Sequence, residues 1–410
     1  PHGFLCSESH YAAAKQIAEE GIVLLQNKNN VLPINTQKAK RVLVVGENAI
    51  KMMTVGGGSS SLKVQREISP LEGLKVRLAK DGIEVDYARG YVGDVTGNYN
   101  GVTTGQNLED KRSEAELIAE AVEKAKTADY VIMFGGLNKS DFQDCEGHDR
   151  KQYELPYNQD KLIEALAKAN RNFVYVNISG NAVAMPWKAK VAGIVQGWYI
   201  GSESGEALAS ILTGDANPCG KLPFTWVNSL KEVGAHALNT YPGTWRKEGG
   251  ASTKGNIIDE EYKEGIYVGY RWTDKERIKP TFAFGHGLSY TQFEISNLRS
   301  DKPQITQDDS ITFTVNVKNT GKRAGSEVVQ LYIHDVKSSV DRPEKELKGF
   351  QKVYLQPGEN KDVSITVNKE ALSFYDESSA SWKAEAGKFE ALVGNTSDNL
   401  KLKKVFELKK

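Results

Sequence analysis

The sequence lacks the cysteine and histidine patterns that mark disulfide-rich or metal-binding domains. Its three cysteines, Cys6, Cys145 and Cys219, are far apart, and none belongs to a CxxC pair. An odd number of cysteines argues against a disulfide framework. The six histidines are equally scattered, with no pair at helical spacing. We therefore expect no metal site and no bound cofactor.

The sequence also lacks an excess of either charge and any long apolar run. Lys plus Arg and Asp plus Glu both number 53. Nucleic acids and anionic membranes select proteins with a basic excess, so neither is an expected partner. No apolar run approaches the roughly 20 residues of a membrane-spanning helix. The mean hydropathy of −0.47 is typical of a soluble globular protein.

The start and the length of the chain both bear on its domain content. The chain begins Pro1-His2-Gly3, without Met and without the apolar segment of a signal peptide. We expect an internal or processed start, with a part upstream removed or left out. At 410 residues the chain is too long for one ordinary core, so we expect two or three domains.

The first half of the chain alternates between helical patterns and short apolar runs rich in β-branched residues, up to about residue 225. Strands that alternate with helices predict βαβ units and a largely parallel sheet covered on both faces. The predicted helices span 9–25, 113–125, 158–169 and 203–212, with a further helix opening at Ser69-Pro70. The predicted strands span 41–46, 83–87, 130–134, 173–178 and 194–198.

The composition changes after Tyr290. Short β-rich runs are there separated by turn signals such as Asn319-Thr320-Gly321 and Pro357-Gly358. This spacing, with almost no helical periodicity, predicts a β-sandwich of about 120 residues. An irregular stretch rich in Gly, Tyr and Trp precedes it, from about Pro223 to Ser289. The predicted strands span 311–317, 328–333, 353–355, 363–367 and 389–393.

Two glycine-rich places follow the strand predicted at 41–46. Gly46 ends that strand, but the GxGxxG spacing of a dinucleotide site is missing. The second place is the run Gly56-Gly57-Gly58-Ser59-Ser60. Glycines let a backbone approach a ligand closely, and Ser59 or Ser60 offers a hydroxyl. Composition alone favours a plain tight turn, so the residues leave ligand binding open.

A long polar loop, 137–156, follows the strand predicted at 130–134. In parallel α/β sheets, ligands bind at loops that leave the carboxyl ends of strands. A general acid needs a carboxyl group whose proton survives near neutral pH, which burial or a neighbouring negative charge provides. A solvated loop with a structural Asp149–Arg150 pair is equally compatible with the residues. The charged or titratable candidates are Asp141, Asp144, Glu146, His148, Asp149 and Arg150.

Ten motifs, read in order, resemble family 3 glycoside hydrolases along essentially the whole chain. Any one of these motifs is weak, and the ordered series is specific. The segment with the most chemistry is CEGHDRKQYELPYNQ at 145–159. The others are EEGIVLLQNKNNVLPI (19–34), VLVVGENA (42–49), GGGSS (56–60), PLEGL (70–74), GDANPCGKLPFTW (214–226), EGIYVGYRW (264–272), FGHGLSYTQF (284–293), GSEVVQLYI (325–333) and RPEKELKGFQKVYLQPGE (342–359).

The resemblance implies an architecture. It implies a mostly parallel six-stranded α/β sandwich followed by an all-β fibronectin type III-like sandwich. We expect a linker and first helix at 1–35, the α/β sandwich with the acid/base loop at 36–225, an irregular interdomain segment at 226–294, and the fibronectin type III-like domain at 295–410.

The resemblance also implies a function. Such a protein is a retaining, exo-acting β-glycosidase, with β-glucosidase expected first, that removes terminal β-linked sugars from oligosaccharides. Glu146 takes the place of the general acid/base, and Ser59 falls where some relatives contact the sugar. The nucleophile of these enzymes lies on an N-terminal barrel, which this sequence does not contain. We therefore expect the 410 residues alone to be inactive.

Several alternatives stay open at this point. A β-xylosidase or a dual glucosidase/xylosidase is the second choice, because the barrel holds most of the sugar-binding residues. A non-catalytic carbohydrate-binding or scaffolding protein is the choice from another class. The expected partners are a β-glycoside or oligosaccharide substrate, a barrel domain or chain, and a second copy in a homodimer. Relatives of this architecture often work outside the cytoplasm, so we expect a periplasmic or extracellular location.

Overall fold

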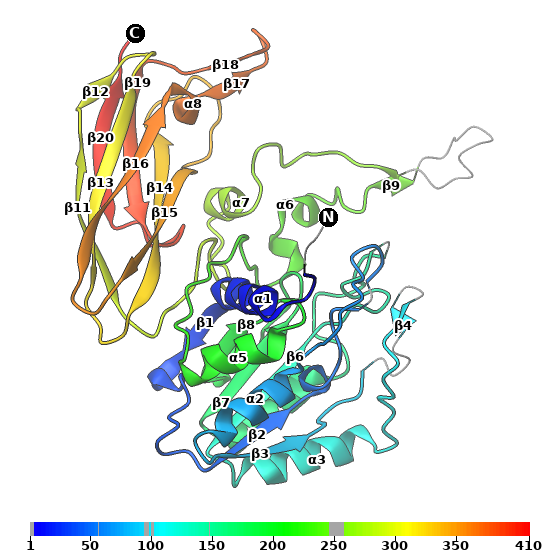
Figure 1. Cartoon of the computed structure of the whole chain (residues 1–410). Coiled ribbons are helices and arrows are strands. Elements are labelled where there is room, and N and C mark those ends of the chain that lie inside the picture. Colours follow the sequence, from blue (N-terminus) through cyan, green and yellow to red (C-terminus); the bar gives the residue numbers. More distant parts are fainter. Residues whose placement is uncertain (1–3, 56, 94–97, 100–101, 147, 246–257) are drawn as a thin grey trace. The chain divides into compact units, whose positions relative to one another are not determined.

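The computed structural model describes residues 4–410 except 56, 94–97, 100–101, 147 and 246–257 (Figure 1). The chain divides into two compact units. The first comprises Pro1–Lys221 together with the short segment Gly287–Tyr290, and the second comprises Leu222–His286 and Thr291–Lys410. The segment Gly287–Tyr290 therefore returns to the first unit between two stretches of the second.

The first unit is built on a six-stranded sheet in the order β1-β8-β7-β6-β2-β3. All neighbouring strands are parallel except the edge strand β1, which runs antiparallel to β8. The mostly parallel six-stranded sheet is thus confirmed. In chain order the strands are β1 (Val23–Asn27), β2 (Arg41–Val45), β3 (Glu84–Ala88), β6 (Tyr130–Gly136), β7 (Phe173–Ile178) and β8 (Gly193–Gln196). A short hairpin, β4 (Asn98–Tyr99) and β5 (Val102–Thr103), lies between β3 and β6 in the sequence.

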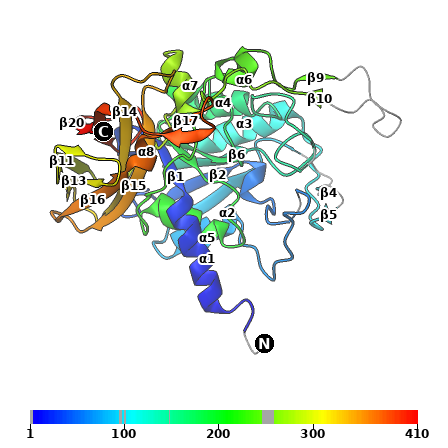
Figure 2. The ribbon, with the colours of Figure 1, turned by 90° about the horizontal axis from the view of Figure 1, so that it is seen from above.

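Helices cover both faces of this sheet. The helices α2 and α5 pack together over one face, with α1 against α5, and α3 and α4 pack together over the other (Figures 1 and 2). Alternate strand residues, such as Val42 and Val44 of β2, join Leu74 of α2 and Leu208 of α5 in one buried cluster. The helices are α1 (Glu8–Gly21), α2 (Pro70–Ala79), α3 (Glu114–Ala125), α4 (Gln159–Ala169) and α5 (Ser204–Thr213).

The start of α2 shows how the local sequence sets an element. Ser69 is the N-cap and Pro70 is the first helical residue, as predicted. The Ser69 hydroxyl accepts a hydrogen bond from the Glu72 backbone N–H, and the Glu72 carboxylate accepts one from the Ser69 N–H. Such a cap stabilises a helix by about 1 kcal/mol.

The predicted C-terminal end of the first helix was wrong. Helix α1 stops at Gly21, whereas the prediction carried it to residue 25. Residues 23–25 belong instead to β1, and Ile22, Val23, Leu24 and Leu25 are all buried. Four consecutive buried residues suit a strand with cover on both faces better than one stripe of a helix.

The second unit contains the β-sandwich, which confirms the all-β prediction. A three-stranded sheet, β11-β13-β16, and a five-stranded sheet, β12-β20-β19-β14-β15, enclose one core. Residues of β13 alternate in burial, with Ile311, Phe313, Val315 and Val317 in that core. The strands are β11 (Phe293–Ser300), β12 (Gln304–Ile305), β13 (Ser310–Asn319), β14 (Gly325–Asp335), β15 (Glu346–Leu355), β16 (Asn360–Asn368), β19 (Gly387–Gly394) and β20 (Leu402–Leu408).

Three strands of the sandwich were not predicted: β11, β12 and β20. In β20 only Phe406 and Leu408 are buried, and β11 has a register shift after Ser296 with Asn297 at a positive φ of 56°. The alternation of apolar and polar residues that predicts a strand is therefore weak in these segments. Further short elements are α6 (Gly234–Ala237), α7 (Tyr270–Lys275), the helical turn α8 (Lys369–Leu372) and the hairpins β9–β10 (Thr244–Trp245, Ile258–Asp259) and β17–β18 (Phe374–Asp376, Ser381–Lys383).

None of the helices in the described parts of the chain combines the length and the apolar character that crossing a membrane requires.

A buried ion cluster lies just beyond the carboxyl end of β2. The Glu47 carboxylate contacts Lys51 Nζ at 2.9 Å and Arg89 Nη2 at 2.7 Å. All three side chains are more than nine-tenths buried. Charges withdrawn from water in this way are stable only while they remain paired. The loop that leaves β2 is therefore anchored at its base.

We predict that Glu47→Gln destabilises the first unit. The amide keeps the shape of the side chain but removes the negative charge that both buried cations contact, which costs about 3–5 kcal/mol. The measurement is hydrogen exchange of the β2 amides, which should accelerate. The control is Glu164→Gln, because the Glu164–Lys190 pair is exposed and is worth about 0–1 kcal/mol. Equal exchange in both variants would contradict the prediction.

Candidate active site

Two loops start side by side at the carboxyl edge of the sheet. One follows β2 and carries Ser59, and the other follows β6 and carries Glu146. Asn48 joins them at their bases, since its side-chain amide donates to the carbonyl oxygens of Gly135 (3.1 Å) and Leu137 (2.9 Å). The side chain of Asn48 is buried, so water does not compete for these hydrogen bonds.

Gly46 makes this close approach possible. Its φ is +111°, and a Cβ at this position would lie 2.1 Å from the carbonyl oxygen of Phe134 in β6. Only glycine fits such a contact. Gly46, directly after β2, therefore allows β2 to pack closely against β6.

The structure brings together the two site residues predicted from the sequence. The Glu146 carboxylate oxygen Oε2 accepts hydrogen bonds from the Ser59 backbone N–H at 2.7 Å and from the Ser59 hydroxyl at 2.6 Å. The Glu146 N–H also donates to the Gly57 carbonyl oxygen at 3.2 Å. Both side chains are exposed. Gly56 of the glycine run and Gly147 of the EGHDR motif lie outside the described residues.

These contacts set the protonation of Glu146. The Ser59 hydroxyl, and after it the Ser59 backbone N–H, lower the pKa of the Glu146 carboxyl. Donors that point at a carboxylate stabilise its charged form. Within this chain these donors therefore favour the charged form of the Glu146 carboxyl group.

Asp144, two residues earlier, has the opposite environment. Burial raises the pKa of its carboxyl group, and the two hydrogen bonds that it accepts only partly oppose the rise. These come from the Gly180 N–H at 2.7 Å and the Tyr199 hydroxyl at 2.9 Å. Gly180 follows β7 and Tyr199 follows β8, so Asp144 ties the β6 loop to the next two loops of the same edge.

Arg150 also shapes this loop. Its guanidinium donates to the Asn181 side-chain oxygen and the Ala182 carbonyl oxygen, both at 2.7 Å, and to the Tyr153 carbonyl oxygen at 2.9 Å. Each acceptor belongs to the protein backbone or to an amide side chain. These contacts fit a structural role of Arg150 in shaping the loop.

Among the described residues, the outer turn of this loop brings together three side chains that could hold a metal ion. Asp141 Oδ1 lies 3.9 Å from Cys145 Sγ and 3.5 Å from His148 Nδ1. The three ligand atoms all lie within 4.8 Å of one another. The ring of Phe142 stacks on that of His148, with 4.8 Å between the centroids.

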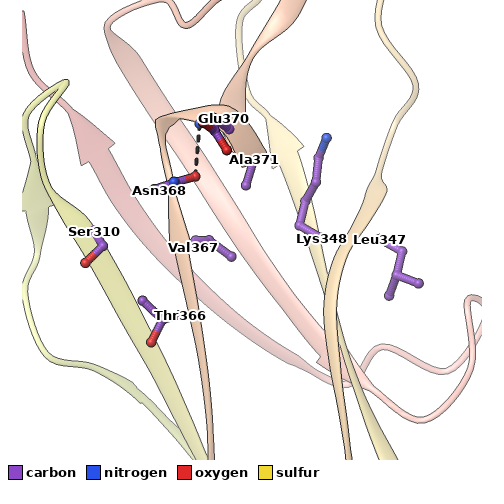
Figure 3. A pocket seen from close by; sticks show the side chains of 8 residues that line it. All are labelled: Ser310, Leu347, Lys348, Thr366, Val367, Asn368, Glu370 and Ala371. Carbon is purple, nitrogen blue, oxygen red and sulfur yellow. Dashed lines mark hydrogen bonds between the residues drawn. The ribbon is translucent and has the colours of Figure 1, made fainter.

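A separate hollow of about 470 Å³ lies in the β-sandwich (Figure 3). Leu347 and Lys348 of β15 and Thr366 and Val367 of β16 line it, with Asn368, Glu370, Ala371 and Ser310 around them. Burial lowers the pKa of Lys348. Glu370 is the one carboxylate among these lining residues, and its N–H donates to the Asn368 side-chain oxygen at 3.1 Å. This lining offers no pair of carboxylates for hydrolysis.

Residues 22–270 match the glycosyl hydrolase family 3 C-terminal domain, and residues 327–397 match a fibronectin type III-like domain. The chain belongs to glycosyl hydrolase family 3. This family 3 chain is 48% identical to β-glucosidase BoGH3A of Bacteroides ovatus over 418 aligned residues, 99% of the chain and 53% of that protein. It is 39% identical to thermostable β-glucosidase B of Acetivibrio thermocellus, over 97% of the chain and 48% of that protein.

Solved structures of family 3 β-glucosidases have the same fold. The Bifidobacterium adolescentis enzyme aligns with a TM-score of 0.84 and 31% identity, over 99% of this chain and 54% of that one. The Kluyveromyces marxianus β-glucosidase in complex with glucose aligns with a TM-score of 0.85 and 29% identity, over 99% and 62%. The chain thus spans about half the length of the curated relatives it matches.

We predict that Ser59→Ala raises the pKa of the Glu146 carboxyl group. The variant removes the hydroxyl donor and keeps the backbone N–H, so the value rises without losing all of its depression. A carbon-13 NMR titration of the Glu146 carboxyl measures the change. Ser60→Ala is the matched control and should leave the titration where it is. A fall, or no change, in Ser59→Ala would contradict the described contact.

Proposed function

We propose that this chain forms the acid/base-bearing part of a β-glucosidase that removes terminal β-linked glucose from oligosaccharides. The observation that carries the proposal is the contact between Ser59 and Glu146, at the carboxyl edge of a family 3 sheet. Support comes from the curated relatives, which are named as β-glucosidases, and from a structural relative solved with glucose.

The proposed mechanism is retaining and uses two carboxyl groups about 5–5.5 Å apart. A nucleophilic carboxylate on a barrel outside these 410 residues attacks the anomeric carbon. Glu146 donates its proton to the glycosidic oxygen as the bond to the leaving group breaks. In the second step Glu146 takes a proton from water, which attacks the same carbon and releases the sugar.

Ser59 has a positioning role in this mechanism. It holds one oxygen of Glu146 through two hydrogen bonds and leaves the other oxygen for the substrate. The lowered pKa suits the second step, in which Glu146 must be a base. For the first step, a sugar and a barrel that displace water around this exposed carboxyl would raise its pKa by desolvation.

Asp144 is the competing candidate for the acid, because burial raises the pKa of its carboxyl group. Its Oδ2 is, however, occupied by the Gly180 N–H and the Tyr199 hydroxyl, and the side chain is only partly exposed. These contacts fit a group that fixes the loop. Asp144 therefore serves as the matched control for Glu146.

The test uses the glycosidase that contains this chain together with its barrel. Glu146→Gln should lower turnover of an unactivated disaccharide by about 10²–10⁴-fold, the range that general acid/base help provides. Aryl β-glucosides with good leaving groups need little protonation, so their glycosylation step should suffer far less and deglycosylation should become limiting.

Azide supplies a nucleophile that needs no base. It should restore turnover of the activated aryl glucoside by Glu146→Ala and give a β-glucosyl azide, which also reports retention. Asp144→Asn should show no such rescue. Normal disaccharide hydrolysis by Glu146→Gln would refute the assignment. Azide rescue of Asp144→Asn in place of Glu146→Ala would also refute it. The 410-residue chain alone should hydrolyse neither substrate.

A further inference from the structure

The outer turn of the acid/base loop holds three groups that the proposed hydrolysis does not use. They are the carboxylate of Asp141, the thiol of Cys145 and the imidazole of His148. Thiolate, imidazole and carboxylate are the ligands that proteins use for Zn²⁺. They come from one loop, at positions i, i+4 and i+7.

The distances are close to those of a tetrahedral zinc site. With metal–ligand bonds of roughly 2.0–2.3 Å, neighbouring ligand atoms stand roughly 3.4–3.6 Å apart. Asp141 Oδ1 lies 3.5 Å from His148 Nδ1 and 3.9 Å from Cys145 Sγ. The remaining pair, Cys145 and His148, lies within 4.8 Å, and small rotations of the half-buried Cys145 and the exposed His148 side chains would close it.

The backbone on the N-terminal side of His148 is already fixed at two points. Asp144 is held by Gly180 and Tyr199, and Glu146 is held by Ser59. Cys145 lies between these two anchored residues. The Phe142 ring, stacked on His148, restricts the rotation of the imidazole. A site with ligands fixed in this way loses little conformational entropy when a cation binds.

We propose that Asp141, Cys145 and His148 bind one Zn²⁺ ion, with water in the fourth position. A thiolate with an imidazole selects zinc over Mg²⁺ and Ca²⁺, which prefer oxygen ligands. This proposal departs from the expectation of no metal site, which rested on the absence of CxxC pairs and of histidine pairs at helical spacing. The spacing Cys145-x₂-His148 mixes the two residue types.

Zinc at this position ties together the residues on either side of Glu146. Cys145 precedes it and His148 follows two positions later. A cation bound by both ligands therefore restrains the segment that carries the acid/base carboxyl. Bound metal should slow amide hydrogen exchange across residues 141–151.

The test uses the untagged 410-residue chain carrying Cys6→Ser and Cys219→Ser, which leaves Cys145 as its one thiol. Cobalt(II) replaces zinc as a visible probe. One Co²⁺ per chain should bind, with a thiolate-to-cobalt charge-transfer band in the near ultraviolet, and Zn²⁺ should displace it. Bound Zn²⁺ should also protect Cys145 from alkylation, and a chelator should reverse the protection.

Ligand variants decide the assignment. Cys145→Ser should abolish the charge-transfer band, and His148→Ala or Asp141→Asn should weaken Co²⁺ binding about tenfold or more. His334→Ala, in the β-sandwich, is the control and should change nothing. Binding without a thiolate band, a band that survives Cys145→Ser, or zinc that leaves hydrogen exchange at 141–151 unaltered would overturn the proposal. Circular dichroism of each variant establishes that loss of binding reflects a lost ligand.

Discussion

The candidate site depends on the two hydrogen bonds that the buried side-chain amide of Asn48 donates. This amide donates both of its hydrogens to carbonyl oxygens on either side of Gly136, where β6 ends and the acid/base loop begins. Asn48 itself stands at the start of the loop that carries Ser59. The contact between Ser59 and Glu146, 87 residues apart, thus rests on a bridge between two neighbouring strand ends. The adjoining cluster of Glu47, Lys51 and Arg89 keeps that bridge in place.

The two acidic residues of the loop divide positioning from chemistry. Asp144 is partly withdrawn from water and tied to the loops after β7 and β8, whereas Glu146 is exposed and its carboxylate accepts hydrogen bonds from Ser59. A group that must approach a substrate benefits from exposure, and a group that fixes a loop benefits from burial. The directions of the two pKa shifts follow from this difference in surroundings.

Much of the fold was predictable because its signals are local. Strand β7 was predicted to the residue, since Phe173–Ile178 is an apolar run interrupted only by Asn177, and the sequence Ser69-Pro70 marks the N-cap and first residue of α2. The boundary between α1 and β1 was missed, because apolar residues at 22–25 extend a helical pattern as readily as they form a strand. Tertiary pairing with β8 decides between them.

The site was predictable in part, and by a different route. Glu146 and Ser59 came from the resemblance to a family, and no local pattern indicates that they touch. The hydrogen bonds from Gly180 and Tyr199 to Asp144 were also not predicted, although each residue follows a strand of the same parallel sheet. The rule that such strands end at one edge would have brought these three together. The cluster of Asp141, Cys145 and His148 was not predicted, because neither a CxxC pair nor a histidine pair marks it in the sequence.

The return of Gly287–Tyr290 to the first unit has a consequence for biosynthesis. Leu288 pairs with Leu24 beside the edge strand β1, and the Tyr290 hydroxyl donates to the Ile211 carbonyl oxygen of α5. The first unit is therefore incomplete when a ribosome has finished residue 221. Its edge stays open until 65 further residues, Leu222–His286, have been made. All six strands of the sheet are made before that point, but a nascent chain exposes the outer edge of β1 while these residues are synthesised, and an exposed strand edge can pair with another chain.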